Sequence, residues 1–170
     1  VGKPSTIAFD GDPVPHFYGH EKTGESICLQ ILTRLKFPNK FIERVSSAVS
    51  RHMKFSHVEG MKPSKWKRII AGDIFPLEME LHRIDCLSSH KRTNNFVLML
   101  DRISEMSNIT ELPPLLINGT DLIAIGYKQG PELGKILKEI RDLQLEGQIM
   151  TKEEALKTVS EKYSPRSANI

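Results

Sequence analysis

The chain has 170 residues, of which 39% are hydrophobic and 26% are charged, values that are ordinary for a globular protein and exclude a disordered chain. No run of about 18 apolar residues occurs, which excludes a transmembrane helix, and we expect a cytoplasmic protein without a membrane partner. The net charge of +3 permits nucleic-acid binding without requiring it. Cys28 and Cys86 lie in apolar helical patterns without CxxC spacing, which is typical of reduced core thiols and argues against zinc.

The N-terminal part of the chain predicts a short hairpin followed by helices. Extended segments at the two ends of 5–17 flank a turn of Asp and Gly residues, which is typical of a small hairpin or an extended arm. Apolar residues then recur every three or four positions over 20–36 and again after Pro38, which indicates two helices. Further helices are expected over 63–70, from Pro76 through Ile84, and over 96–106.

The C-terminal part, residues 115–163, predicts three helices with clear start signals. Asn118 can cap the first helix while Asp121 reaches back to the freed backbone donors, much as in a capping box. Gly130-Pro131 begins the next helix, because proline is preferred at the first helical position. The last helix, over 152–163, follows a Thr-x-x-Glu capping box.

This C-terminal segment resembles the RNA-binding body region of the bacterial tRNA nucleotidyltransferase and poly(A) polymerase family. The matching motifs stand in the order and spacing that this family uses. They are Pro113-Pro114-Leu115-Leu116, Asn118-Gly119-Thr120-Asp121-Leu122, Gly126, Gly130-Pro131-Glu132-Leu133-Gly134, Leu137, Leu145-Glu146-Gly147 and the helix start from Thr151 to Ala155. The resemblance implies a helical body that holds tRNA or other RNA by its shape and its phosphate backbone.

The N-terminal half resembles the HD-type metal-dependent phosphohydrolase domain of many bacterial members of the same family. The matching residues are Gly2-Lys3-Pro4, Phe17-Tyr18-Gly19-His20-Glu21, Arg51-His52-Met53 and Leu81-His82-Arg83-Ile84-Asp85. Family members usually place a His-Asp pair directly before the position of Val1 and another histidine further upstream. The chain opens inside this motif, so we interpret it as a fragment that also lacks the nucleotidyltransferase head. Nucleotides would bind only through that head, and we assign no catalytic residue to this chain.

The expected fold class is all-α. Residues 1–107 would form an HD-like helical bundle, truncated at its N-terminal side, with a short β-hairpin near the N-terminus. Residues 108–163 would form a smaller helical body that binds RNA, and 164–170 would be a frayed tail. The length agrees with this division, because 170 residues can bury one or two modest cores.

Three polar residues of the HD-like part are candidate metal ligands. Helical spacing places His20, His52 and Asp85 on apolar stripes, and a buried carboxylate needs a partner cation or a metal. In one interpretation the histidines hydrogen bond within the core while Asp85 pairs with a nearby cation such as Arg51 or Arg83. The resemblance instead implies a divalent metal, with Asp85 closing the ligand set of a first ion and the two histidines helping to hold a second. Because the upstream ligands are missing, we expect an incomplete metal site in this chain.

Lys3 and a group of C-terminal residues are the candidates for phosphate contacts. The resemblance matches Lys3 to the lysine beside the His-Asp pair, and a solvated lysine is the alternative. The RNA-binding candidates lie around the second predicted helix start and are Lys128, Gly130, Lys135, Lys138 and Arg141. Lys135 and Lys138 share one helix face, where lysines attract phosphates without regard to sequence. The alternative is a solvated face balanced by the acidic residues Glu132, Glu139 and Asp142.

A second basic group surrounds the single tryptophan, Trp66. It comprises Lys62, Lys65, Lys67 and Arg68. We expect Trp66 to pack in the core or at its boundary, because aromatic residues make up only 6% of the chain and no RNA-binding sheet motif occurs. The remaining histidines, His16, His57, His82 and His90, show no comparable convergence and are expected at the surface or the core boundary.

The sequence therefore predicts the tRNA-binding and tRNA-positioning portion of a CCA-adding or poly(A)-adding nucleotidyltransferase. The alternative is an HD-type metal-dependent phosphohydrolase acting on RNA or nucleotide phosphates, in which a metal-bound water attacks phosphorus. A third interpretation is a structural or dimerisation scaffold, which a large exposed apolar patch would favour. CCA addition and poly(A) addition differ in the head, so these residues do not separate them, and they give no indication of the oligomeric state.

Overall fold

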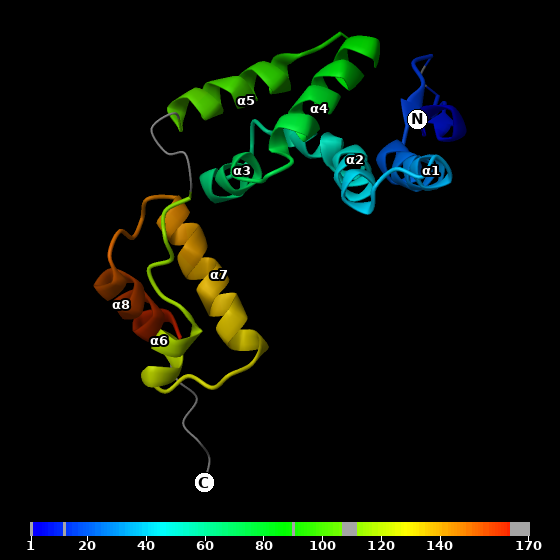
Figure 1. Ribbon diagram of the computed structural model, residues 1–170. Helices are drawn as coiled ribbons and strands as arrows, with labels where there is room; N and C mark the ends of the chain where they lie inside the picture. Colours follow the sequence, from blue (N-terminus) through cyan, green and yellow to red (C-terminus); the bar gives the residue numbers. More distant parts are fainter. Residues whose placement is uncertain (1, 12, 90, 107–111, 164–170) are drawn as a thin grey trace. The chain divides into compact units, whose positions relative to one another are not determined.

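The computed structural model describes residues 2–11, 13–89, 91–106 and 112–163 (Figure 1). Over these residues the secondary structure is helical apart from one two-stranded sheet, which confirms the all-α fold and the short hairpin. The backbone forms two compact units, of which the first comprises 1–60 and 72–107 and the second comprises 61–71 and 108–170. Within the described segments, every helix is too short or too polar to cross a lipid bilayer.

The first unit begins with the hairpin and continues into helices. Strands β1 (Ile7–Ala8) and β2 (His16–Phe17) pair antiparallel, with Ile7 opposite Phe17. The 3₁₀ helix η1 (Lys3–Ser5) precedes the hairpin, and a second 3₁₀ helix, η2 (His52–His57), follows the second α-helix. The α-helices of this unit are α1 (His20–Arg34), α2 (Asn39–Arg51), α4 (Phe75–Ser89) and α5 (Asn94–Glu105).

The core of the first unit lies among η2, α4 and α5. Phe55 is fully buried, and its ring lies 6.2 Å from the ring of Phe75 and 5.3 Å from that of His82, measured between centroids. Met99 of α5 is fully buried as well. The expectation that His82 lies at the surface or boundary is wrong, because this side chain is only 4% exposed. His82 is on the face of α4 that meets Phe55, and spacing along one helix does not reveal that partner.

The second unit contains α3 (Pro63–Ile70), α6 (Gly119–Ala124), α7 (Pro131–Leu145) and α8 (Lys152–Lys162). Its core is apolar and consists of Ile117, Leu122, Ile136, Ile140, Ile149, Ala155 and Val159. Both predicted capping boxes are present. The Asn118 side chain accepts bonds from the Thr120 and Asp121 amides, and the Asp121 side chain accepts one from the Asn118 amide at 2.9 Å. Thr151 and Glu154 make the equivalent exchange at the start of α8.

Helix α3 packs against the C-terminal half of α7, although the sequence division grouped it with residues 1–107. The Lys67 ammonium donates to the Leu145 carbonyl at 2.7 Å, and the Ser64 hydroxyl donates to Glu146 at 2.9 Å. Trp66 is 4% exposed, which confirms its predicted packing role. The predicted boundary at 107 and the predicted tail over 164–170 both lie outside the described residues.

Candidate functional site

The structure brings His20, His52 and Asp85 together from three elements of the first unit. His20 is the first residue of α1, His52 follows α2, and Asp85 lies on α4. One ligand atom of each residue lies within 4.8 Å of the other two. Both histidines are buried, whereas the Asp85 side chain is 25% exposed. The resemblance divided these residues between two ions, and the geometry gathers them around one point.

Backbone carbonyls fix the tautomer of both histidines. Nδ1 of His20 lies 2.8 Å from the Phe17 oxygen, and Nδ1 of His52 lies 2.6 Å from the Val49 oxygen. A carbonyl only accepts, so both Nδ1 atoms carry protons and both Nε2 atoms are left with lone pairs in the neutral rings. The two Nε2 atoms are 3.1 Å apart. Two lone pairs cannot hydrogen bond to each other, so the pair needs either a proton on one ring or a cation between the rings.

Burial of the His52 ring acts against the extra proton. It lowers the pKa of His52, because the charged imidazolium is poorly solvated there, and electrostatic repulsion from His20 and Lys3 lowers it further. The Val49 carbonyl and the Asp85 carboxylate oppose this shift without reversing it. Nδ1 bonded to a backbone carbonyl, with Nε2 directed at a shared point, is also how proteins orient histidine ligands toward a metal.

Lys3 is the cation that meets Asp85. Its ammonium lies 2.6 Å from the Asp85 Oδ1 atom and also donates to the Ser89 hydroxyl. Asp85 therefore pairs with a nearby cation as expected, but this cation is Lys3 and not Arg51 or Arg83, the two examples that the sequence suggested. The predicted alternative of a solvated Lys3 is wrong, because its side chain is only 23% exposed.

The two arginines pair with other acids of α4. Arg51 lies 3.8 Å from a carboxylate oxygen of Glu78, and Arg83 binds Glu80 at 2.6 Å. Arg83 and Glu80 lie three positions apart on one helix, whereas helical periodicity could not reveal the pairing of Lys3 with Asp85, because most of the first unit separates them in the sequence.

A cavity of about 120 Å³ lies at this cluster. It is lined by Lys3, His20, Val49, His52, Leu81 and Asp85. Two imidazole nitrogens and a carboxylate oxygen form a donor set that suits zinc, manganese or iron. Lys3 neutralises Asp85 in the same cavity, so a metal ion and the lysine would compete for this carboxylate.

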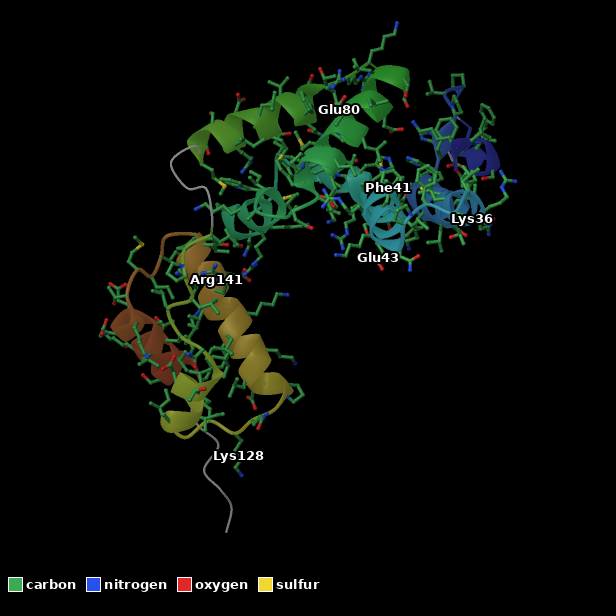
Figure 2. The ribbon with its side chains drawn as sticks, viewed as in Figure 1. Lys36, Phe41, Glu43, Glu80, Lys128 and Arg141 are labelled. Atoms are coloured by element: carbon green, nitrogen blue, oxygen red, sulfur yellow. The ribbon has the colours of Figure 1, made fainter. Side chains whose placement is uncertain are left out.

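The RNA-binding candidates are spread along α7 and do not form one cluster. Lys128 and Arg141 lie near opposite ends of the helix (Figure 2). Gly130 is exposed, with an extended backbone that does not require glycine. Arg141 is partly buried and donates to the Pro114 carbonyl at 3.3 Å and to Gln144 at 2.8 Å. Burial and the nearby charge of Arg68 lower the pKa of Arg141.

Lys135 and Lys138 are both exposed on one face of α7. Among the residues that the structure describes, neither has a hydrogen-bond or ion-pair partner. Two of the acids that could have balanced them are engaged elsewhere, since Glu139 binds Lys162 at 2.8 Å and Asp142 binds Arg68. Lys62, which precedes α3, and Lys65 on α3 are exposed as well, whereas Lys67 and Arg68 bind α7.

Residues 22–159 match the family model described as tRNA nucleotidyltransferase domain 2. The chain therefore belongs to this family. This member of the tRNA nucleotidyltransferase domain 2 family is 28% identical to an A-adding tRNA nucleotidyltransferase of Deinococcus radiodurans over 163 residues, which are 91% of this chain and 38% of the relative. It is 32% identical to a CC-adding tRNA nucleotidyltransferase of Thermus thermophilus over 157 residues, which are 91% of this chain and 36% of the relative. No solved structure shows significant similarity to the chain.

The chain thus spans little more than a third of the length of the two curated relatives. The domain match covers most of both compact units and includes α7, His52 and Asp85, whereas His20 and Lys3 lie before its first residue. Sequence reasoning missed two features of this family member. It did not identify the pairing of Lys3 with Asp85, and it did not place the basic helix α3 against α7.

Proposed function

We propose that the second unit binds the phosphate backbone of tRNA and positions it for a tRNA nucleotidyltransferase. The observation that carries the proposal is the exposed pair Lys135 and Lys138, which lacks acidic partners among the described residues. Lys128 adds an exposed cation just before the N-terminal end of α7. Lys65 adds another on α3, the helix that packs against the C-terminal half of α7. Unpaired lysines on a rigid helix attract phosphates without reading sequence, and this suits a protein that recognises its substrate by shape.

The nucleotide that the whole protein adds is not assigned by similarity. One relative is named as an A-adding enzyme and the other as a CC-adding enzyme, and the two are about equally similar to this chain. A surface that contacts the backbone would serve either reaction, because the tRNA body is the same in both. The proposal for this chain is therefore binding and positioning of tRNA.

Binding of a fluorescent tRNA acceptor minihelix across a salt series tests the proposal. We expect saturable binding by the wild type, with log Kd rising with log salt concentration. Lys135→Glu/Lys138→Glu should weaken binding by at least about tenfold and reduce the salt slope by roughly two, since about one counterion is released per phosphate contact. Lys22→Glu/Lys157→Glu is the matched control, because both lysines are exposed and the net charge changes equally.

The control separates a local contact from an effect of net charge. Equal losses in the two double variants would contradict a binding site on α7. No binding by the wild type at low salt would contradict the proposed function itself.

A metal-dependent phosphohydrolase remains the second candidate function, and the facing lone pairs of His20 and His52 favour it. These histidines and Asp85 would hold the ion, which would supply a Lewis acid for the attack of water on phosphorus. Lys3 would place a positive charge beside the bound phosphate when it releases Asp85.

Metal content measured after equilibrium dialysis against Zn²⁺ or Mn²⁺ tests this candidate without an activity assay. We expect about one ion per chain in the wild type and its loss in His52→Ala. His57→Ala is the matched control, because His57 lies outside the cluster. Equal metal content in the wild type and His52→Ala would exclude the cluster as the metal site.

A further inference from the structure

The connection between α1 and α2 carries an exposed pair of stacked aromatic rings. The rings of Phe37 and Phe41 lie 4.9 Å apart between centroids, with an interplanar angle of 19°. Phe37 is 40% exposed and Phe41 is 44% exposed, and the neighbouring Leu35 is 58% exposed. We call residues 33–44 the α1–α2 turn. Phe41 belongs to the apolar spacing that predicts the helix after Pro38, yet it is exposed to solvent.

The backbone holds this aromatic pair in place. The Phe37 amide donates to the Leu32 carbonyl and the Lys36 amide donates to the Thr33 carbonyl, which is the bonding of a Schellman motif at the end of α1. Lys36 takes the left-handed position of that motif, with a φ of 58°. The Phe41 amide donates to the Pro38 carbonyl and so begins α2. The two rings are therefore presented on a fixed turn and need little ordering when they bind a partner.

The α1–α2 turn is also strongly basic. It contains four cationic residues and a single acidic residue, Glu43, so its net charge equals the +3 of the whole chain. Arg34, Lys36 and Lys40 are exposed and have no acidic partner in the part of the chain that the structure describes. Arg44 lies 3.8 Å from the exposed Asp73. Figure 2 labels Lys36, Phe41 and Glu43 in this region.

Exposed aromatic rings surrounded by cations suit unpaired nucleotides better than a second copy of this chain. A second copy of this chain would bring the same positive charges against one another in a symmetric contact, which is unfavourable. Unpaired nucleotides offer flat apolar bases that stack on aromatic rings, together with phosphates that bind lysine and arginine. The charge and the rings of the α1–α2 turn complement these two features together.

We propose that the α1–α2 turn is a second RNA contact, at which Phe37 and Phe41 stack with an unpaired nucleotide and the surrounding cations bind its phosphates. The proposal rests on the proposed function, that is, on RNA binding by this chain. It adds a site in the first unit that recognises single-stranded RNA, whereas the α7 lysines bind backbone in either form.

The experiment compares two RNAs on the full chain. One is a blunt stem, and the other is the same stem with an unpaired 3′ extension that carries 2-aminopurine. Phe37→Ala/Phe41→Ala should bind the extended RNA about tenfold more weakly than the wild type and the blunt stem with less than twofold change. Stacking should quench the 2-aminopurine fluorescence in the wild type and in Phe37→Tyr/Phe41→Tyr, but not in the alanine variant.

Leu115→Ala/Met150→Ala is the matched control, because these apolar side chains are 62% and 71% exposed in the second unit. It should bind both RNAs as the wild type does. Binding that is lost in Lys135→Glu/Lys138→Glu but unchanged in the phenylalanine variant would overturn this inference and leave the proposed function standing. A wild type that binds neither RNA would overturn the proposed function. Light scattering that shows a dimer only while both phenylalanines are present would assign the turn to self-association and overturn the inference.

Discussion

Gly2 is the residue on which the position of Lys3 depends. It is buried with a φ of +94°, and a Cβ atom there would lie 2.3 Å from the His20 oxygen and 2.8 Å from the Gly24 nitrogen. Only glycine allows η1 to lie this close to the backbone of α1. The close approach places the Lys3 ammonium against Asp85, so a backbone contact between η1 and α1 sets the charge of the histidine cavity.

Gly2→Ala is therefore expected to destabilise the first unit by about 1–3 kcal/mol, the usual cost of forcing a side chain into a strained backbone position. Chemical denaturation measures the change. Gly60→Ala is the control, because nothing lies within 4 Å of its added Cβ, and it should change the free energy of unfolding by less than about 0.5 kcal/mol. Equal effects of the two substitutions would show that the approach of η1 to α1 is not tight.

Tyr163 and Glu139 form a hydrogen bond that makes the stability of the second unit depend on pH. The Tyr163 hydroxyl donates to the Glu139 carboxylate, and this bond raises the pKa of Tyr163 from 10.0 to about 12. The folded state thus holds the phenolic proton more tightly than the unfolded state. The bond contributes its full stability below pH 10, and this contribution is lost as the pH rises from 10 to 12.

The free energy of unfolding of the wild type and of Tyr163→Phe should therefore converge above pH 10. The wild type should be the more stable protein at pH 8, because the variant lacks the bond to Glu139. Lysine deprotonation occurs in both proteins and cancels in the difference. A difference that stays constant from pH 8 to 12 would contradict the proposed coupling.

At the scale of elements, the helix starts of the second unit depend on hydrogen bonds between residues that are close together in the sequence. Asn118 and Thr151 each cap a helix through bonds to residues two or three positions away. Asn118→Ala should cost about 1 kcal/mol of stability, the usual value for the loss of an N-cap. Urea unfolding with Ser160→Ala as the comparison measures this, because Ser160 lies exposed in the last turns of α8. A change no larger than that of Ser160→Ala would contradict the capping role.

This locality explains which elements could be predicted from the sequence. The bounds of α3 were predicted without error, because Pro63 marks its start and the apolar spacing runs to Ile70. The partner of α3 could not be predicted, since the contact between Ser64 and Glu146 joins residues that are distant in the chain. Phe41 shows the same limit, because its spacing indicates an apolar face of α2 but does not tell which part of that face another helix covers.

The candidate site was predictable in its residues and not in its pairings. His20, His52 and Asp85 were identified, and the structure brings them together. The facing Nε2 atoms depend on two backbone carbonyls, and the partner of Asp85 depends on how η1 lies on α1. Both are consequences of packing, which spacing along the sequence does not contain.

At the scale of the whole molecule, the path of the chain assigns α3 to the second unit while the residues on both sides of it belong to the first. Lys67 satisfies the Leu145 carbonyl at the end of α7, where the last carbonyls of a helix lack partners within the helix. Arg68 binds Asp142 one turn earlier. Helix α3 thereby completes the end of the helix that carries the proposed RNA-binding lysines.

Lys67→Met/Arg68→Ala should accordingly loosen the end of α7 and leave the first unit unchanged. Loss of one hydrogen bond and one partly exposed ion pair should lower the local opening free energy by about 1–2 kcal/mol, which corresponds to roughly 5- to 30-fold faster amide exchange. Hydrogen exchange measured by mass spectrometry resolves peptides over 131–145 from those over α1 and α4. Lys65→Met is the control, because Lys65 is an exposed lysine of the same helix. Faster exchange in α4 instead of α7 would place α3 with the first unit, and the basic residues of α3 would then no longer belong to the surface proposed to hold tRNA.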